Sequence, residues 1–405
     1  MTGASGSPVR MLATAAALVM GFAVAASAQA PAEEAPKMKF GPVELRPRLL
    51  FHNIGVDNNV YNVAENPTSD YTFGAQPDMQ ISMRPGRLRF IWLTGTEFVY
   101  YHREKTERSA NQSQNLTADV DLNFMRPFIS YSSANTSARA NAEVDLRAKH
   151  QPRALSAGSS FRMGTRSTAS VSWKRAREKY DDDGSTFRGQ KLSETLNSQI
   201  RTLEGSVGLV LTPVTTVSLV LGRDDLTFDL APIRNSKSLR IAPTVNFTPG
   251  GPISGSASIG YRKLDGEDAT LPDYSGLAMN GGIVMLLGGR FRFETRFARD
   301  VQYSYESSLP YFVLTGGRAT LATQLSDLID VRLTGGRDLM AYRAYGGQPS
   351  PGSDNLDIYG GGVGFLIGDR KRFVITAEFV RRQSARDRSR EFRNNRIFGA
   401  LTFGA

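Results

Sequence analysis

Three histidines are the first candidates for chemistry in this sequence of 405 residues. Each of His52, His102 and His150 could act as a catalytic base. The enzyme would be a hydrolase with a Ser–His–Asn or Ser–His–Asp triad, or a protease with an Asp–His pair. No recognisable nucleophile motif flanks any of them. We therefore expect the three side chains to be solvated near strand ends, and we predict no catalytic residue.

Two further motifs could hold a ligand. The run Asp181-Asp182-Asp183-Gly184 offers oxygen ligands for a divalent cation, but it lacks the spacing and the distal glutamate of a calcium loop. The glycines of residues 360–364 could cradle a phosphate, but no helix follows them. A polar turn explains the aspartate run, and close strand packing explains the glycines. The chain contains no cysteine, which excludes a thiolate metal site. We predict no metal and no cofactor.

Charged and polar residues alternate with apolar ones in many segments. In residues 116–124 the even-numbered positions are apolar and the odd-numbered ones are polar, and residues 291–297 set phenylalanines against Arg292, Glu294 and Arg296. Because alternate side chains of a strand share a face, each such segment predicts a strand with one apolar and one polar face.

Compact turn clusters recur about every 40 residues between Arg84 and Arg370, and one longer polar stretch separates each from the next. This rhythm predicts an antiparallel meander of about eighteen strands, with sixteen as the fallback because Asn280-Gly281 could form a hairpin turn and Gly360 to Gly362 blur the alternation. The predicted strands are 43–53, 71–83, 87–101, 114–125, 128–138, 150–163, 167–179, 192–212, 214–224, 237–248, 253–263, 274–286, 290–302, 312–325, 329–340, 355–367, 372–382 and 394–404.

A soluble β-sandwich also alternates, but its strands hold about five or six residues, whereas many segments here hold register for about ten. Aromatic residues at strand ends, such as Tyr71 and Tyr100, fit the girdles of a membrane barrel. The predicted fold is therefore all-β, a transmembrane antiparallel up-and-down β-barrel with a water-filled lumen.

The N-terminus predicts export. Arg10 precedes an apolar run that ends in small residues, which is typical of a signal peptide over residues 1–28; the alternative is a retained membrane anchor, for which the run is short. We expect a flexible periplasmic segment at 29–41 and the barrel at 42–405. An even number of strands places both termini in the periplasm and the chain in the outer membrane of a Gram-negative cell.

The predicted inner rows carry charges that either set solute selectivity or pair with one another to stabilise the wall. The candidate lumen-lining residues are Asp119, Asp121, Arg240, Arg292, Glu294, Arg296, Asp330, Arg332 and Glu378.

The positive net charge, +10 for the whole chain, is dispersed along strands and loops rather than gathered in one arm, which argues against nucleic acid. It is rich in one predicted extracellular loop, which we expect to contact anionic lipid headgroups or polymers. The basic residues of this loop are Arg381, Arg382, Arg386, Arg388, Arg390 and Arg393.

Residues 42–50, followed by Gly55 to Tyr61, resemble the N-terminal signature of outer-membrane β-barrel porins found beside exopolysaccharide genes, with Asp57-Asn58-Asn59 where that pattern often has a second aspartate. The last strand places Ile397, Leu401 and Phe403 on one face. It resembles the aromatic C-terminal strand that the insertion machinery of outer-membrane barrels recognises, although the chain ends at Ala405. The resemblance implies an outer-membrane protein tied to polysaccharide export or surface assembly.

These observations predict a porin-like channel, not an enzyme, that passes small solutes or a secreted glycan. The expected partners are outer-membrane lipids including lipopolysaccharide, small solutes or polysaccharide, and the outer-membrane insertion machinery. Two alternatives remain. One is a surface receptor or scaffold that binds lipid or polysaccharide and has a blocked lumen, and the other is a hydrolase at the rim.

Overall fold

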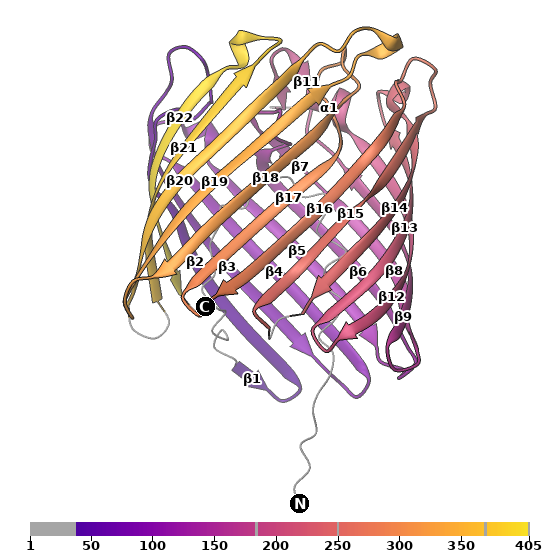
Figure 1. Cartoon of the computed structure of the whole chain (residues 1–405). Helices are drawn as coiled ribbons and strands as arrows, with labels where there is room; N and C mark the ends of the chain where they lie inside the picture. The colour runs from indigo at the N-terminus through magenta and orange to yellow at the C-terminus, as the bar shows by residue number, and fades with distance from the viewer. Residues whose placement is uncertain (1–37, 183–184, 249–250, 368–370, 404–405) are drawn as a thin grey trace, which may run out of the picture.

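The computed structural model describes residues 38–182, 185–248, 251–367 and 371–403, and most of them belong to one antiparallel sheet (Figure 1). The sheet has 20 strands, of which 18 are long and close into a barrel. The barrel strands are β2 (Val43–Asp57), β3 (Asp70–Met83), β4 (Leu88–Tyr101), β5 (Ser109–Val120), β6 (Met125–Arg139), β8 (Arg153–Met163), β9 (Ser167–Glu178), β12 (Ser198–Thr212), β13 (Thr215–Phe228), β14 (Ser236–Phe247), β15 (Ile253–Gly266), β16 (Tyr274–Leu287), β17 (Phe291–Tyr303), β18 (Tyr311–Gln324), β19 (Ile329–Tyr342), β20 (Ser353–Leu366), β21 (Lys371–Ser384) and β22 (Phe392–Phe403). The predicted fold class and the count of eighteen strands are confirmed.

The remaining elements are short. They are β1 (Met38–Phe40), β7 (Arg147–His150), β10 (Thr186–Phe187), β11 (Gln190–Lys191), α1 (Leu192–Leu196) and the 3-10 turns η1 (Lys105–Glu107), η2 (Pro232–Arg234), η3 (Tyr345–Gly347) and η5 (Arg388–Arg390). Over the described ranges, no helix has both the length and the apolar character needed to cross a membrane.

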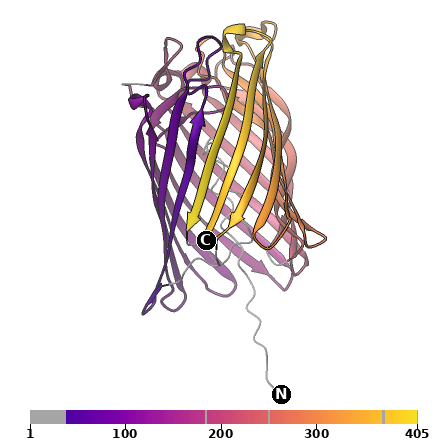
Figure 2. The ribbon, with the colours of Figure 1, turned by 90° about the vertical axis from the view of Figure 1, so that its left-hand side faces the viewer.

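The barrel closes where its last strand pairs with its first. β22 runs antiparallel to β2, with Val56 opposite Ile397 and Leu50 opposite Thr402 (Figure 2). A register shift between Phe51 and Ile54 interrupts this pairing, and beside it the rings of Phe51 and Phe403 meet edge to face at 6.0 Å. The aromatic residue of the closing strand therefore packs on the outside of the seam.

The connections differ between the two rims of the barrel. Short turns lie at one rim, the turn rim, together with both ends of the described chain, and the longer connections lie at the opposite rim, the loop rim (Figure 1). The expected signal peptide at 1–28 and most of the expected flexible segment lie outside the described residues. At the end of that segment, Met38 and Lys39 instead belong to β1, which pairs with β2.

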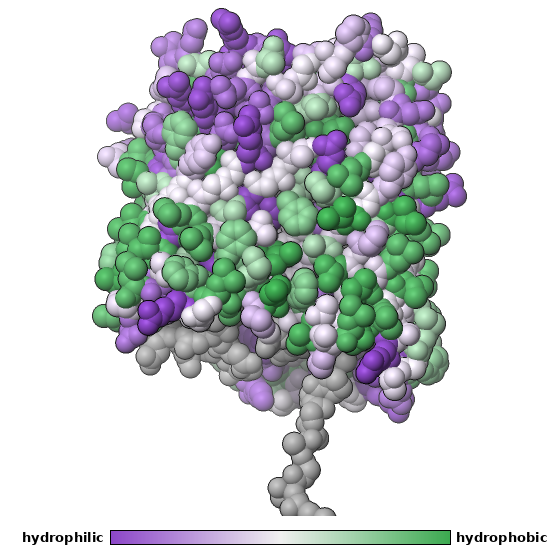
Figure 3. All heavy atoms as spheres, in the orientation of Figure 1, coloured by the Kyte–Doolittle hydropathy of each residue, from purple (hydrophilic) through white to green (hydrophobic). Residues whose placement is uncertain are grey.

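The alternation of the sequence places apolar rows outside. Leu203, Val207 and Leu221 are between 54% and 59% exposed, although leucine and valine side chains normally avoid water. Figure 3 shows apolar side chains gathered over the middle and the turn-rim side of the visible face, and hydrophilic ones toward the loop rim. Exposed aromatic residues include Tyr71 and Tyr100 near the loop rim and Phe124 near the turn rim. This belt fits the hydrocarbon layer of a bilayer.

Several predicted boundaries are wrong. The strand expected at 114–125 ends at Val120, because Asn123 adopts a positive φ of 67° and the turn lies there rather than at Arg126-Pro127. Residues 192–196 form α1 instead of the start of a strand. Asn280 and Gly281 lie inside β16 and form no hairpin turn. The turns expected at 249–252 and 368–370 fall on ranges that include residues outside the described part of the chain.

Candidate functional site: the inner wall and the loop-side cluster

The inner face of the barrel divides into two kinds of surface. From β5 to β15 it is rich in serine and threonine, whose hydroxyl groups pair between neighbouring strands. Ser170 Oγ of β9 lies 2.7 Å from Ser206 Oγ of β12, and Thr244 Oγ1 of β14 donates to Ser258 Oγ of β15 at 3.0 Å. We call this surface the hydroxyl strip. The rest of the wall carries most of the arginines and carboxylates.

The register places most of the predicted lumen-lining residues on these inner rows. The inner-row members are Asp119, Arg240, Arg292, Glu294, Arg296, Asp330, Arg332 and Glu378. Asp121 is different, because it lies beyond the end of β5 in the turn, where its Oδ1 accepts a hydrogen bond from the backbone N–H of Asn123. Its expected place on a lumen-facing strand row is therefore not observed.

Most of the inner-row carboxylates are paired. Asp119, only 4% exposed, accepts from Arg89 at 2.8 Å and from Arg126 at 2.6 Å. Asp330 pairs with Arg372 and lies 3.5 Å from Arg332. The sequence left open whether these charges face solute or pair with one another, and the contacts show pairing for several of them.

Glycines stand directly opposite many inner-row charges. Gly222 faces Arg240, Gly316 faces Asp338 and Gly364 faces Asp330 in the strand register. A Cβ on Gly316 would lie 1.9 Å from the Asp338 carboxylate, and one on Gly364 would lie 2.4 Å from the Asp330 carboxylate. The charged side chains therefore lie along the wall in the space that the glycines leave. This arrangement keeps them from projecting across the lumen.

Near the loop rim the wall opens between β16 and β17. Their pairing ends at Met279 opposite Arg299, whereas β17 and β18 stay paired up to Tyr303 opposite Tyr311. Beyond Arg299, β17 is no longer paired with β16, and its loop-rim end contacts the inner faces of β13 and β15. The Tyr303 ring lies 4.8 Å from the ring of Phe228 in β13, and Asp300 pairs with Arg262 of β15 at 2.7 Å. The β17–β18 hairpin tip therefore lies inside the barrel.

Burial confirms this position. Residues 311–314 of β18 are each at most 2% exposed, so both faces of this part of the strand are covered. Tyr311 and Val313 pack against Leu264 and Tyr274 of the inner wall, and the opposite face belongs to a second apolar cluster that also touches Ala142. A barrel strand with one face toward lipid does not show this pattern.

Two further segments join the tip. Val144 of the β6–β7 connection and Leu192 of α1 are fully buried in one cluster with Tyr305. We call residues 140–146, 192–196 and 303–312 the loop-side cluster. Because these segments come from distant parts of the chain and meet inside the barrel, they narrow the lumen at the loop rim.

A fully buried carboxylate stands at the centre of this cluster. Glu143 accepts from Ser304 Oγ at 2.8 Å and from the backbone N–H of Tyr305 at 3.1 Å, and it lies 3.6 Å from Arg390 Nη1. Arg390 also reaches Asp354 Oδ2 at 3.2 Å. Burial raises the pKa of the Glu143 carboxyl although Arg390 lies beside it.

A second carboxylate, Glu306, lies beside the same arginines, but its pKa shifts in the opposite direction. Arg386 donates to it at 2.9 Å, and Arg390 lies 3.2 Å away. Burial opposes the ionised form of Glu306, but the hydrogen bond and charge of Arg386 hold its pKa below the usual range. The cluster thus holds one carboxyl whose pKa is raised and one whose pKa is lowered.

The predicted basic loop is therefore divided between two environments. Arg382 is 1% exposed and Arg390 3%, and the Arg386 side chain is 11% exposed, so these three face the loop-side cluster instead of lipid or polymer. Arg388 and Arg393 are exposed, and Arg381 lies half-buried on an outer row. Sequence reasoning missed the acidic partners Glu143, Glu306 and Asp354. Alternating apolar residues in 140–146 are the signal that this connection is buried.

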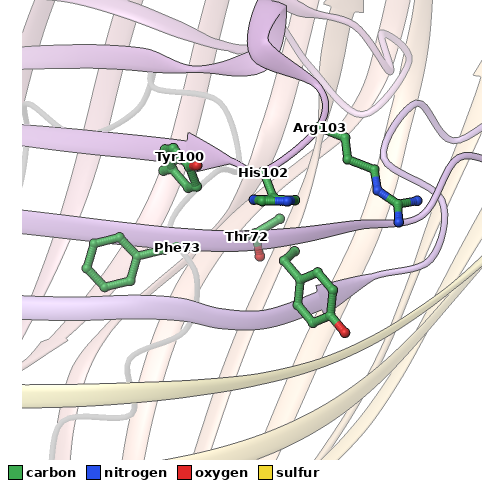
Figure 4. A pocket seen from close by; sticks show the side chains of 6 residues that line it. Thr72, Phe73, Tyr100, His102 and Arg103 are labelled. Carbon is green, nitrogen blue, oxygen red and sulfur yellow. The ribbon is translucent and has the colours of Figure 1, made fainter.

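The histidines have structural surroundings. His52 is 6% exposed and lies 3.1 Å from Glu97 Oε1, so it is buried rather than solvated at the rim. His150 stacks on the ring of Tyr180 at 5.2 Å. His102 lines a shallow depression of about 380 Å³ at the outer edge of the loop rim, with Thr72, Phe73, Tyr100 and Arg103 (Figure 4).

The two ligand motifs of the sequence have ordinary surroundings where they are described. Asp181 donates its backbone N–H to Lys149 O, and Asp183 and Gly184 lie outside the described residues. Gly360 to Gly364 lie within β20, as the strand interpretation predicts. Among the described residues, no group of three or more histidine, aspartate or glutamate side chains is placed to hold a metal ion.

Three solved structures share this fold over most of the chain. OccK2 (OpdF) of Pseudomonas aeruginosa has a TM-score of 0.52 at 8% identity, covering 89% of this chain and 97% of that one. The outer membrane protein opdK of Pseudomonas aeruginosa scores 0.51 at 8% identity, covering 89% and 98%. A BenF-like porin of Pseudomonas fluorescens Pf-5 scores 0.50 at 12% identity, covering 89% and 99%.

No protein-family model and no curated protein matches the sequence. At these identities the three structures establish the fold alone, which is that of outer-membrane porins. Together with the apolar outer belt, the closed 18-stranded barrel places the chain in the outer membrane.

Proposed function

We propose that this protein is an outer-membrane channel for passive passage of small polar solutes or of a secreted glycan. The observation that carries the proposal is the position of the inner-row charges against cross-strand glycines. A wall whose carboxylates and guanidinium groups lie flat leaves the centre of the lumen to water. We also propose that the loop rim faces the cell exterior and both termini face the periplasm, after removal of residues 1–28 as a signal peptide.

The hydroxyl strip supports passage of a carbohydrate. Pairs such as Thr117 with Ser130, at 3.0 Å, expose oxygen atoms that both donate and accept hydrogen bonds. Sugar hydroxyls have the same dual character, so a glycan can exchange one hydroxyl partner for the next along the wall. This is consistent with the sequence resemblance to barrels found beside exopolysaccharide genes.

Planar bilayer recordings test the channel. Purified protein should give stepwise conductance, and neutral oligosaccharides added to one side should reduce the current by entering the lumen. A protein that inserts but passes no ions, even after the loop-side cluster is loosened by substitution, contradicts the proposal.

The loop-side cluster favours one alternative, a receptor or scaffold with a closed lumen. Its buried network of Glu143, Arg390 and Asp354 resembles a fixed plug more than a mobile loop. The two functions differ in one measurement, because a receptor keeps its surface ligand when ion flux is absent. A rim hydrolase would use His102 or His150, so loss of hydrolysis in His102→Ala or His150→Ala would support it. Absence of turnover on lipid or peptide substrates would dismiss it.

A further inference from the structure

Five exposed arginines gather on the outer face of the barrel. They lie toward the loop rim on four strands that are neighbours in the sheet, at the right of Figure 1. These residues, which we call the outer arginine patch, are Arg153 of β8, Arg175 and Arg177 of β9, Arg201 of β12 and Arg223 of β13. The same outer rows carry the lipid-facing residues Val171, Trp173 and Leu203, so the patch faces away from the lumen.

The register brings these cations together. Arg153 stands directly opposite Arg177, and Arg175 directly opposite Arg201. Residues directly opposite in an antiparallel pair have Cα atoms about 5 Å apart, and like charges at that spacing destabilise the sheet. An anion that binds between the guanidinium groups removes this cost.

The chain itself supplies little of the missing negative charge. Arg177 pairs with Asp229 at 2.9 Å, but both side chains are exposed, and such pairs contribute little. Arg175 donates to the neutral amide oxygen of Gln199 at 2.8 Å. Arg201 and Arg223 form no ion pair or side-chain hydrogen bond with any residue that the structure describes. Asp225 stands opposite Arg201 in the register without pairing with it.

A second outer group of arginines shows the contrast. On β19 and β21, Arg337 and Arg381 both stand opposite Asp357 of β20, and Arg337 Nε lies 3.4 Å from the Asp357 carboxylate. That group contains its own central acid. In the outer arginine patch the acid in the corresponding place, Asp225, stands opposite Arg201 but forms no ion pair with it among the described residues.

The depth of the patch indicates the kind of anion. Trp173, 39% exposed, precedes Arg175 by two residues, which is about 7 Å along a strand. Tryptophan marks the boundary between hydrocarbon and headgroups. Apolar residues continue from Trp173 toward the turn rim through Leu203, Val207 and Leu209. A ligand with acyl chains on these rows therefore has its headgroup at the level of the arginines.

We propose that the outer arginine patch binds the phosphate groups of a multiply acylated, phosphorylated glycolipid of the outer leaflet. The planar fork of arginine suits phosphate oxygens, and two facing arginines can share one phosphate. The acyl chains pack on Val171, Trp173 and Leu203, and the remaining arginines neutralise a second phosphate. The site rests on the proposed outward orientation of the loop rim, and it does not depend on whether the lumen conducts.

A binding measurement tests the proposal. Purified full-length protein in detergent is given lipopolysaccharide, or the same lipopolysaccharide after enzymatic removal of its lipid phosphates. The double variant Arg175→Gln with Arg201→Gln should bind the phosphorylated glycolipid at least about tenfold more weakly, because two charge-assisted contacts are lost. Dephosphorylation should weaken wild-type binding to a similar extent and should change the binding of the double variant little.

The control is Arg337→Gln, which removes an outer arginine of β19 on the other side of the barrel. This variant should bind the phosphorylated glycolipid within about twofold of wild type, because Arg337 makes no proposed contact with the glycolipid. Equal binding of both glycolipid forms, or equal loss in the control variant, would overturn the proposal. Intact barrel mobility on unheated gels shows that each variant is folded.

Discussion

Arg240 Nη2 of β14 lies 2.8 Å from Glu204 Oε2 of β12, although all of β13 lies between the two strands. The contact is possible because Gly222 of β13 stands opposite both residues and has no side chain. A Cβ at Gly222 would already lie 3.4 Å from Arg240 Nη2. The ion pair therefore spans a strand by lying flat on the inner wall.

Gly222→Val should break this pair. The branched side chain occupies the space above β13 and forces the guanidinium group into the lumen, which narrows the path. We expect lower single-channel conductance with little loss of barrel stability, since valine favours strands. Bilayer recordings measure the conductance. Gly335→Ala is the control, because a Cβ there meets nothing within 4 Å, and equal effects of both variants would contradict the argument.

Arg296 and Arg318 stand opposite each other on the inner rows of β17 and β18, and Arg296 is exposed. Replacing both by alanine removes two positive charges from the lumen wall and should shift ion selectivity toward cations. The reversal potential in a salt gradient measures this shift. Arg89→Ala is the comparison variant. It removes a guanidinium group that is already paired with Asp119, so its reversal potential shows the effect of losing a paired charge. An unchanged reversal potential in the double variant would place these two arginines outside the conducting path.

Arg390→Ala should loosen the loop-side cluster. It removes the nearer of the two arginines beside the buried carboxylates of Glu143 and Asp354 and leaves only Arg386, at 3.8 and 3.9 Å. Removing one partner of a buried ion pair typically costs about 3–5 kcal/mol. We expect higher conductance and faster proteolysis within residues 140–146. The exposed Arg388→Ala serves as control, and closed channels in both variants would favour the receptor function.

Acid should also open the cluster, through Glu306. Its folded pKa is lowered, so its stabilising contribution is present above the ordinary glutamate pKa of about 4.3 and is lost as the pH falls through the lower folded value. Channel open probability should therefore rise in this acid range. Glu306→Gln should be open at neutral pH and show no such step.

Glu143 has the opposite sign. Because its folded pKa is raised, the folded cluster holds its proton more tightly, and the contribution of this group is present below the ordinary pKa and lost as the pH rises through the raised value. Glu143→Gln should therefore make the closed state less sensitive to a rise in pH. Measuring open probability against pH in both glutamine variants separates the two groups, and identical profiles would refute the assignment.

The sequence by itself determined the barrel. Alternation has a period of two and is a local property, so it predicted strands and the row on which Asp119, Arg240 or Arg296 lies before any register was known. The turn rhythm gave the number of strands, since each short polar turn reverses the chain. Boundaries failed where a single residue acted, as at Asn123, whose positive φ moved a turn and took Asp121 off the strand.

Only the tertiary structure decided what the inner face and the loops do. The bridge from Glu204 to Arg240 depends on a register across three strands, and alternation contains no information on register. The inward position of Arg386 and Arg390 depends on Glu143 and Glu306, which are separated from them by between 80 and 247 residues in the chain. Arg382 pairs with Asp145, which is 237 residues away. The sequence alone predicts that charges in a loop are solvated, because acidic partners that are distant along the chain cannot be identified from it. Closure of the barrel brings those partners together and turns a basic rim into a buried cluster.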